Sequence, residues 1–257
     1  MSDRAGAGLP DGYRLVTIAA EPDLWDPLDV LCSSVWPEFM LHDPIANGYW
    51  DRLRTEWPAF QLAMVDETGR VVAGANSAPL SWNGTDAGLP DGWDDQFERS
   101  IADAGAGRPA EALGALQIVV ARDRRGRGLS AVILEAMRRS ATEAGLGSVI
   151  ACVRPTDKAR YPLMSFDDYI TWTRPDGLPF DPWMRVHSRL GARIVRASPK
   201  SMEIAAPVDK WREWTGLEFP VSGPYVAEGA LVPLQIDLAA GRGVYYDPNV
   251  WMVHTVA

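Results

Sequence analysis

The sequence predicts an α/β fold in which a mixed central sheet is flanked by helices. Short apolar or alternating segments, typical of strands, are interspersed with segments whose apolar residues recur every three or four positions, as in helices packed on a core. In addition, residues 116–153 read in order as a strand, a turn rich in glycine and arginine, a helix and a short apolar strand suited to a buried parallel pair.

The elements before this segment follow the same alternation. In chain order we expect a flexible N-terminus at 1–12, a strand at 13–18, helices at 23–39 and 48–56, a hairpin of strands at 60–65 and 70–75, and a surface loop at 82–108 with a helical turn near 94–102. The helix after the turn carries its apolar residues on one face and is stopped by Gly145 and Gly147.

The turn after the strand at 116–120 is suited to bind a pyrophosphate. Gly126 and Gly128 lack side chains, so backbone amides can face outward, and the start of the next helix adds partial positive charge. A Walker loop is excluded because no Lys-Ser or Lys-Thr follows Gly128. A dinucleotide loop fits poorly, because residues 152–155 lack the acidic partner of the ribose. Arginines in such a turn can also form a solvated surface without a ligand.

The motif Arg125-x-x-Gly128-x-Ser130 resembles the Gln/Arg-x-x-Gly-x-Gly/Ala loop of the GCN5-related N-acetyltransferase (GNAT) superfamily, with Ser130 as the one departure. Val120, five residues before Arg125, also matches the family's strand end. The resemblance implies a sheet splayed between strands four and five, where a strand-four amide polarises a thioester carbonyl. It implies acyl-coenzyme A or acyl-phosphopantetheine as co-substrate, held by Ile118, Val119, Val120, Arg125, Gly126, Arg127, Gly128, Leu129 and Ser130.

A second resemblance concerns the acid at the thioester sulfur. The family's fourth helix commonly reads Tyr-x-x-x-Gly, and here His187 stands four residues before Gly191, on a helix that Asp181 and Pro182 should begin. Histidine titrates near pH 7, so His187 can act as acid or base, and we assign it with Gln117 to the catalytic set. Because Trp183 shares its face, His187 can alternatively be a hydrogen-bonded core residue.

The resemblance covers residues 13–206, and two further segments carry candidates for acceptor binding. Residues 155–180 form an insertion rich in aromatic and acidic residues that we interpret as a lid, and residues 207–257 form a C-terminal extension packed on the same domain. The substrate-binding candidates are Asp168, Trp172, Asp247 and Asn249, with His254 beside them. Their alternative roles are structural, as anchors of a crossover, turn residues or an outward-facing strand position.

Composition excludes several functions. The net charge of −9 over 257 residues disfavours nucleic-acid binding, and no stretch approaches a membrane span or a secretory signal. Two separate cysteines indicate buried thiols in a reducing cytoplasm, and three scattered histidines make a metal site unexpected.

We therefore expect an N-acyltransferase that moves an acyl group from a phosphopantetheine thioester to the amine of a small molecule, as in specialised metabolism. The donor can be acyl-coenzyme A or an acyl carrier protein, since both present the same pantetheine arm. The alternatives are a catalytically silent thioester-binding module and a thioester hydrolase or decarboxylase using the same cleft. No Gly-x-Ser-x-Gly motif for serine hydrolysis is present.

Overall fold

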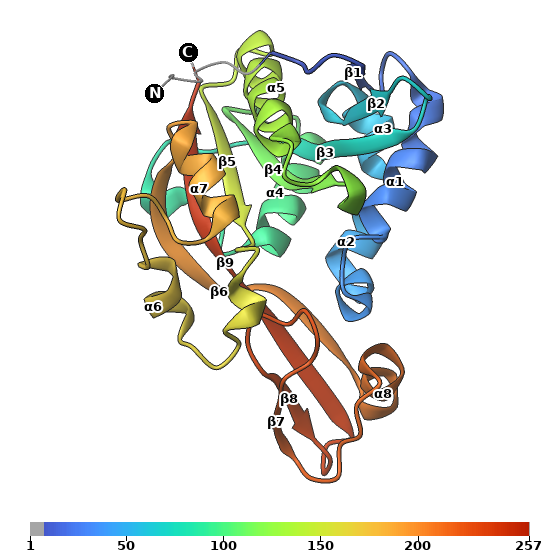
Figure 1. The fold of residues 1–257 in the computed structure, drawn as a ribbon, viewed down its shortest axis with the longest axis vertical. Helices are drawn as coiled ribbons and strands as arrows, with labels where there is room; N and C mark the ends of the chain where they lie inside the picture. Colours follow the sequence, from blue (N-terminus) through green and yellow to red (C-terminus); the bar gives the residue numbers. More distant parts are fainter. Residues whose placement is uncertain (1–7, 257) are drawn as a thin grey trace.

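The computed structural model describes residues 8–256, and a single mixed sheet of nine strands organises it (Figure 1). The strand order is β1-β2-β3-β4-β5-β9-β8-β7, with β6 also paired to β9. Among the strand pairs of the described residues, β4 and β5 alone are parallel. The strands are β1 Tyr13–Thr17, β2 Leu62–Asp66, β3 Val71–Leu80, β4 Ala112–Val120, β5 Ser148–Val153, β6 Arg193–Pro207, β7 Gly223–Tyr225, β8 Leu234–Asp237 and β9 Arg242–Thr255. The predicted α/β fold with a mixed sheet is confirmed.

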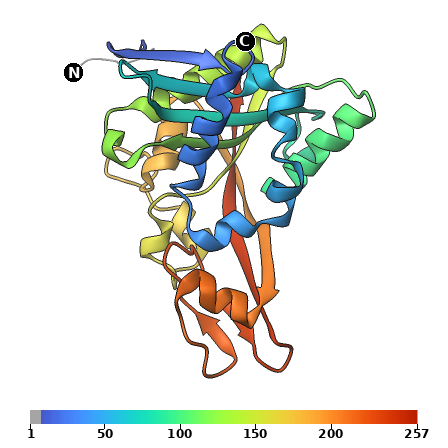
Figure 2. The same cartoon turned by 90° about the vertical axis from the view of Figure 1, so that its right-hand side faces the viewer.

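Helices cover both faces of the sheet. One core joins α1 and α4 to the sheet through residues such as Leu28 and Phe97, and the other joins α5 and α7 through Ile133 and Met184. Figure 2 looks onto the side of α1 and α2. The α-helices are α1 Trp25–Ser33, α2 Pro44–Tyr49, α3 Arg52–Glu56, α4 Trp93–Gly105, α5 Leu129–Glu143, α6 Phe166–Ile170, α7 Pro182–Arg189 and α8 Val208–Thr215. Among these described helices, none is long and apolar enough to cross a membrane.

The helix predicted at 23–39 is shorter than expected. It ends at Ser33, and a separate 3-10 turn follows at Glu38–His42. Pro37 explains the break, because proline has no amide to donate and disfavours helical geometry in the residue before it. The helical turn expected near 94–102 is instead the full helix α4.

The helices nearest the predicted site form as their sequences indicate. α5 buries the predicted apolar face, including Leu129 and Ile133, and its chain turns away at Gly145, whose φ of 75° favours glycine. Asp181 caps α7: its Oδ1 accepts hydrogen bonds from the amides of Trp183 (2.9 Å) and Met184 (3.1 Å).

The predicted splay between the fourth and fifth strands is confirmed. β4 and β5 pair only from Ala112 and Ser148 to Ala115 and Ala151, although β4 continues to Val120. Leu116 is an extra residue in the pairing with β3, a bulge at the point where β4 leaves β5. Side chains of α4 satisfy the carbonyls there: Trp93 Nε1 donates to Leu116 O (2.7 Å) and Gln96 Nε2 to Ala115 O (3.1 Å). The strands can therefore separate without leaving these carbonyls unpaired.

The C-terminal residues do more than extend a finished domain. β9 inserts beside β5, with Ser148 opposite Thr255 and Val153 opposite Val250, and its other edge pairs with β6. The first half of β9 instead meets β8 and forms, with α8, β7 and the end of β6, a narrow lobe of residues 202–247 at one end of the molecule (Figure 1). The boundary expected at residue 206 thus cuts a continuous sheet. Of the N-terminus expected to be flexible, residues 1–7 lie outside the described residues.

Candidate active site

A cavity of about 850 Å³ occupies the opening between β4 and β5. On one face of the sheet its wall comes from the β4–α5 loop and from α7, including Ser130 and His187. On the other face it comes from α1, α2, α4 and the segments that follow α1 and α2, including Trp36, Trp50 and Trp93. Because the strands are splayed, two molecules could enter from opposite faces and meet beside β4.

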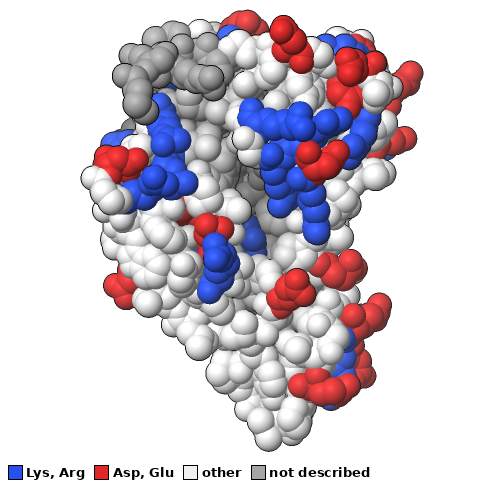
Figure 3. All heavy atoms as spheres, in the orientation of Figure 1, with Lys and Arg blue, Asp and Glu red and all other residues white. Residues whose placement is uncertain are grey.

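The β4–α5 loop has the form expected of an anion cradle. Gly126 and Gly128 have φ angles of 76° and 78°, which favour glycine, and the loop leads directly into the first turn of α5. Arg124 ties the loop to β2 through Asp66 at 3.0 Å, and Arg125 Nε donates to Val120 O at 3.4 Å. Figure 3 shows basic side chains gathered beside the hollow in this region. The loop is therefore held in place, and among the described residues Arg125 has no carboxylate partner that would compete with an anion.

Most of the predicted donor-binding residues line the cavity together. They are Ile118, Val119, Val120, Arg125, Gly126, Gly128, Leu129 and Ser130, whereas Arg127 is exposed and does not line it. Beyond Ala115, β4 still pairs with β3 through Val120, so alternate backbone groups of this stretch face β3 and the others face the opening. Those amides can donate to a thioester carbonyl.

His187 lines the cavity from α7 and is paired with a second histidine. Its Nδ1 lies 2.9 Å from Nε2 of His254, on β9, and both side chains are at most 2% exposed. Burial, and then the neighbouring His254, holds the pKa of His187 well below its usual 6.5. Burial, and then the charge of Arg138, lowers the pKa of His254 to about 4. Both rings are thus neutral at pH 7.

The contact with His254 uses Nδ1 of His187 and leaves Nε2 of that ring outside it. If Nδ1–H of His187 donates to His254, Nε2 carries a lone pair and can accept a proton. In the other tautomer Nε2–H can donate one. The catalytic role of His187 stays a prediction, but the ring combines the packing of a core residue with a place in the cavity wall.

Gln117 also lines the cavity, within a hydrogen-bond chain. Its Nε2 donates to Asn76 Oδ1 (2.8 Å), and its Oε1 accepts from Trp36 Nε1 (2.9 Å). Asn76 in turn donates to Gln61 at 3.0 Å. With both ends of its amide engaged, Gln117 fixes the Trp36 ring in this structure, and its assignment as a catalytic residue stays a prediction.

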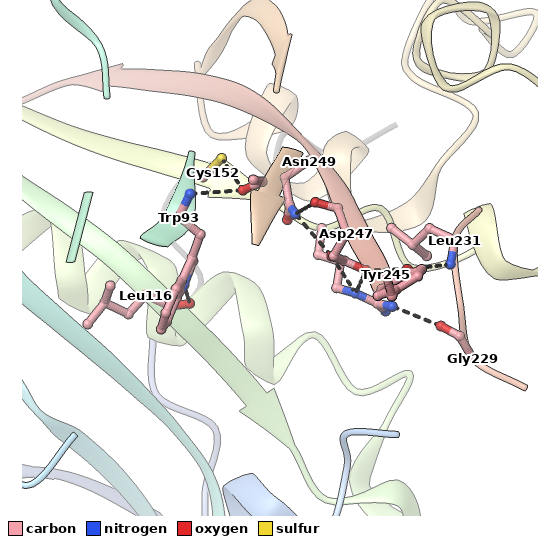
Figure 4. A network of polar contacts seen from close by, with 10 residues as sticks. Trp93, Leu116, Cys152, Gly229, Leu231, Tyr245, Asp247 and Asn249 are labelled. Atoms are coloured by element: carbon pink, nitrogen blue, oxygen red, sulfur yellow. Dashed lines mark hydrogen bonds and ion pairs between the residues drawn. The ribbon is translucent and has the colours of Figure 1, made fainter. Parts of the chain in front are cut away.

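Asp247 is the centre of a buried network (Figure 4). It accepts from Arg154 Nε at 3.0 and 3.1 Å, from Tyr245 Oη at 2.6 Å and from Asn249 Nδ2 at 3.0 Å. Asp247 is fully buried and does not line the cavity, whereas Asn249 does. The arrangement makes Asp247 the counter-ion of Arg154, and of this pair of candidates only Asn249 can reach a bound molecule directly.

The insertion at 155–180 packs as an anchored segment. Tyr161, Tyr169, Trp172 and Phe180 form one aromatic cluster, with Tyr161 and Trp172 centroids 5.2 Å apart. Tyr169 Oη donates to Asp181 at 2.9 Å, which joins the insertion to α7. Thr156 and Ala159 of the insertion line the cavity, but Trp172 and the exposed Asp168 do not, so neither can contact a molecule bound there in this conformation.

Sequence reasoning missed several cavity residues. Arg154 directly follows β5 and lines the cavity. From the sequence, we noted only that this segment lacks the acidic residue of a dinucleotide site. Asp29 lies on α1, in a segment interpreted only through its apolar face. Its position one turn before Cys32 on that face was the available signal. Cys32 and Cys152 also line the cavity, but burial raises the pKa of both thiols, to about 12 for Cys152, so neither is a ready nucleophile.

Within residues 8–256, no group of three or more His, Cys, Asp or Glu side chains is placed to hold a metal ion.

Comparison with known proteins agrees with this geometry. The chain is 34% identical to the arginine N-acetyltransferase avaD of Aspergillus versicolor, over 98% of this chain and 97% of that protein. The loading GNATL domain of CurA from Lyngbya majuscula has a TM-score of 0.58 and 17% identity, over 95% of this chain and 97% of that one. The GphF GNAT-like decarboxylase in complex with isobutyryl-CoA has a TM-score of 0.57 and 19% identity, over 95% and 99%. No family model matches the chain.

Proposed function

Because the chain belongs to the GCN5-related N-acetyltransferase superfamily and is an N-acyltransferase of that type, we propose that it transfers an acetyl group from acetyl-coenzyme A to the α-amine of arginine or a similar guanidino compound. The observation that carries the proposal is the cavity through the splayed sheet, with an anion cradle on one face and aromatic and acidic side chains on the other. The relative named as an arginine N-acetyltransferase supports this choice of acceptor.

The donor would lie on the side of α5 and α7. Backbone amides around Gly126 and Gly128 would hold the pyrophosphate, and an amide from the free edge of β4 would polarise the thioester carbonyl. A preorganised donor of this kind contributes roughly 2.7–4 kcal/mol to lowering the barrier.

Transfer forms a C–N bond and breaks the C–S bond, and two protons must move. The acceptor amine must lose its proton before it attacks, and the thiolate that leaves must gain one. Nε2 of His187 is the titratable nitrogen in the cavity wall that can mediate either step, while His254 fixes its ring. Since His187 is neutral at pH 7, it is already in the form that accepts a proton.

The test is to incubate the protein with acetyl-coenzyme A and arginine and to follow both thiol release and the mass of the products. We expect thiol release that depends on arginine, with one acetyl group added to arginine. Thiol release without an acetylated product would instead indicate hydrolysis, and carbon dioxide release from malonyl-coenzyme A would indicate decarboxylation. No release with any amine or thioester would indicate a silent binding module.

The same assay, run with acetyl-coenzyme A and with an acetylated carrier protein, distinguishes the two candidate donors. Acetyl-coenzyme A and an acetylated carrier protein share the pantetheine arm, but only free coenzyme A carries an adenosine phosphate for the β4–α5 loop. Carrier proteins are usually acidic, and Arg138 on α5, which could contact one, is paired with Glu135 at 2.7 Å. This partial neutralisation favours free acetyl-coenzyme A as the donor.

A further inference from the structure

The charges in the cavity wall are unevenly compensated. Five side chains of Asp, Glu, Lys or Arg line the cavity: Asp29, Asp51, Arg124, Arg125 and Arg154. Three of them have ion-pair partners outside the lining: Arg124–Asp66 at 3.0 Å, Arg154–Asp247 at 3.0 Å and Asp51–Arg54 at 3.2 Å. Among the described residues, Asp29 and Arg125 are left without an ion pair, so the cavity offers one free negative and one free positive charge.

The two free charges lie on opposite faces of the sheet. Arg125 belongs to the loop that leads into α5, which packs on one face, whereas Asp29 belongs to α1, which packs on the other. The positive charge therefore faces the side proposed for the anionic donor. The negative charge faces the side left for the acceptor, where an anion would be repelled and a cation attracted.

The wall around Asp29 is aromatic, and its polar atoms are already used. Trp36 Nε1 donates to Gln117 (2.9 Å), Trp50 Nε1 to Asp29 Oδ1 (3.0 Å) and Trp93 Nε1 to Leu116 O (2.7 Å). With their N–H groups bonded within the protein, the three indoles present carbon surfaces to the cavity. The second carboxylate oxygen, Asp29 Oδ2, accepts no hydrogen bond from the described residues. A carboxylate beside indole rings is the chemistry that binds a planar organic cation.

We propose that Asp29 and the ring of Trp50 form the subsite that binds the guanidinium group of the acceptor. The inference rests on the proposed function and names the residues that select the substrate. A guanidinium, with a pKa above 12, stays protonated and is a poor nucleophile. Binding it on the α1 side leaves the α-amine of the same molecule free to reach the opening beside β4, so Asp29 decides both which acceptor binds and which nitrogen reacts.

The experiment compares Asp29→Asn with the unaltered enzyme on arginine and on citrulline, which has the same length but an uncharged ureido group. Asparagine can keep the oxygen that accepts from Trp50, while it removes the charge and puts an NH2 donor in place of the acceptor Oδ2. We expect kcat/KM for arginine to fall on the order of 10- to 100-fold, while the value for citrulline and the KM for acetyl-coenzyme A change little. The preference for arginine over citrulline should therefore nearly vanish.

Asp26→Asn is the matched control. Asp26 lies one turn earlier on the same helix, is 88% exposed and does not line the cavity, so its substitution should leave the preference unchanged. Turnover of arginine with the same preference in Asp29→Asn, or an equal loss of preference in Asp26→Asn, would overturn the role of Asp29 alone. No turnover of arginine by the unaltered enzyme would overturn the proposed acceptor, and the subsite with it.

Discussion

Replacing His187 by asparagine distinguishes the roles of the two nitrogens of its ring. The asparagine amide can occupy the position of Nδ1 and keep the hydrogen bond to His254, which is 2.9 Å long in the structure, but nothing replaces Nε2 at the cavity. Removing a positioned acid or base costs typically 10²- to 10⁴-fold in rate, so we expect turnover to fall by about 10² or more. Stability should change little, because the buried contact survives.

His187→Ala supplies the comparison that calibrates the effect. Alanine leaves His254 unpaired and removes the ring that packs 4.4 Å from Trp183, between centroids. Loss of a buried polar partner costs roughly 1–3 kcal/mol, and for a chain of this length each kcal/mol corresponds to roughly 2–4 °C in Tm. His187→Ala should therefore lose both turnover and several degrees of Tm, whereas His187→Asn should lose turnover alone.

The assay measures thiol release with saturating acetyl-coenzyme A and arginine, and Tm on the same preparations. Activity is expressed per folded molecule, so that instability is not counted as lost catalysis. If His187→Asn turned over at the rate of the unaltered enzyme, Nε2 would have no part in proton transfer. His187 would then be a core residue that happens to border the cavity.

Three further results are expected. Coenzyme A should raise the Tm of the unaltered protein but not that of Gly128→Glu, because glutamate puts bulk and negative charge into the loop. Gly128→Ala, which is strained only by the φ of 78° at this position, should keep part of the Tm increase. Equal increases in all three proteins would exclude the loop as the pyrophosphate site. Because burial lowers the pKa of His254 to about 4 in the folded protein, against about 6.5 when unfolded, His254 alone should lower the free energy of unfolding by up to about 3 kcal/mol between pH 6.5 and 4. His254→Gln should lose this share and keep the part that comes from His187, whose pKa burial also lowers. Lys158 is fully buried and donates to two carbonyl oxygens, and burial lowers its pKa to about 8. The free energy of unfolding should therefore rise by up to about 3 kcal/mol from pH 8 to 10.5. If Lys158→Met showed the same dependence of the free energy of unfolding on pH, this explanation would be wrong.

Local patterns predicted the elements of the fold that depend on nearby residues. Short sequence segments determine three such features: the loop from Arg125 to Ser130, the apolar face of α5 and the helix cap at Asp181. The structure has all three where the sequence predicted them. The breaks between helices were harder to place, because Pro37 interrupts an apolar periodicity that otherwise continues.

Features that depend on distant residues could not be predicted in this way. β5 pairs with β9, about a hundred residues later, and no local pattern in either strand specifies the other. The same holds for the pairing of His187 with His254. It also holds for Asp29, because only the folded structure shows that this carboxylate lines the cavity without an ion-pair partner among the described residues. Asp247 illustrates the converse: an acidic residue in a turn-like sequence became the buried partner of Arg154.

One strand, β9, runs from the lobe to the candidate active site, so it fixes the position of one relative to the other. Its first residues are fitted closely in the lobe, where a Cβ on Gly243 would lie 2.4 Å from Cδ1 of Trp211. Because side chains alternate along a strand, a slip of one residue would turn His254 to the opposite face, away from His187. A mutation in the lobe that shifted β9 by one residue would therefore separate His254 from His187 at the far end of the same strand.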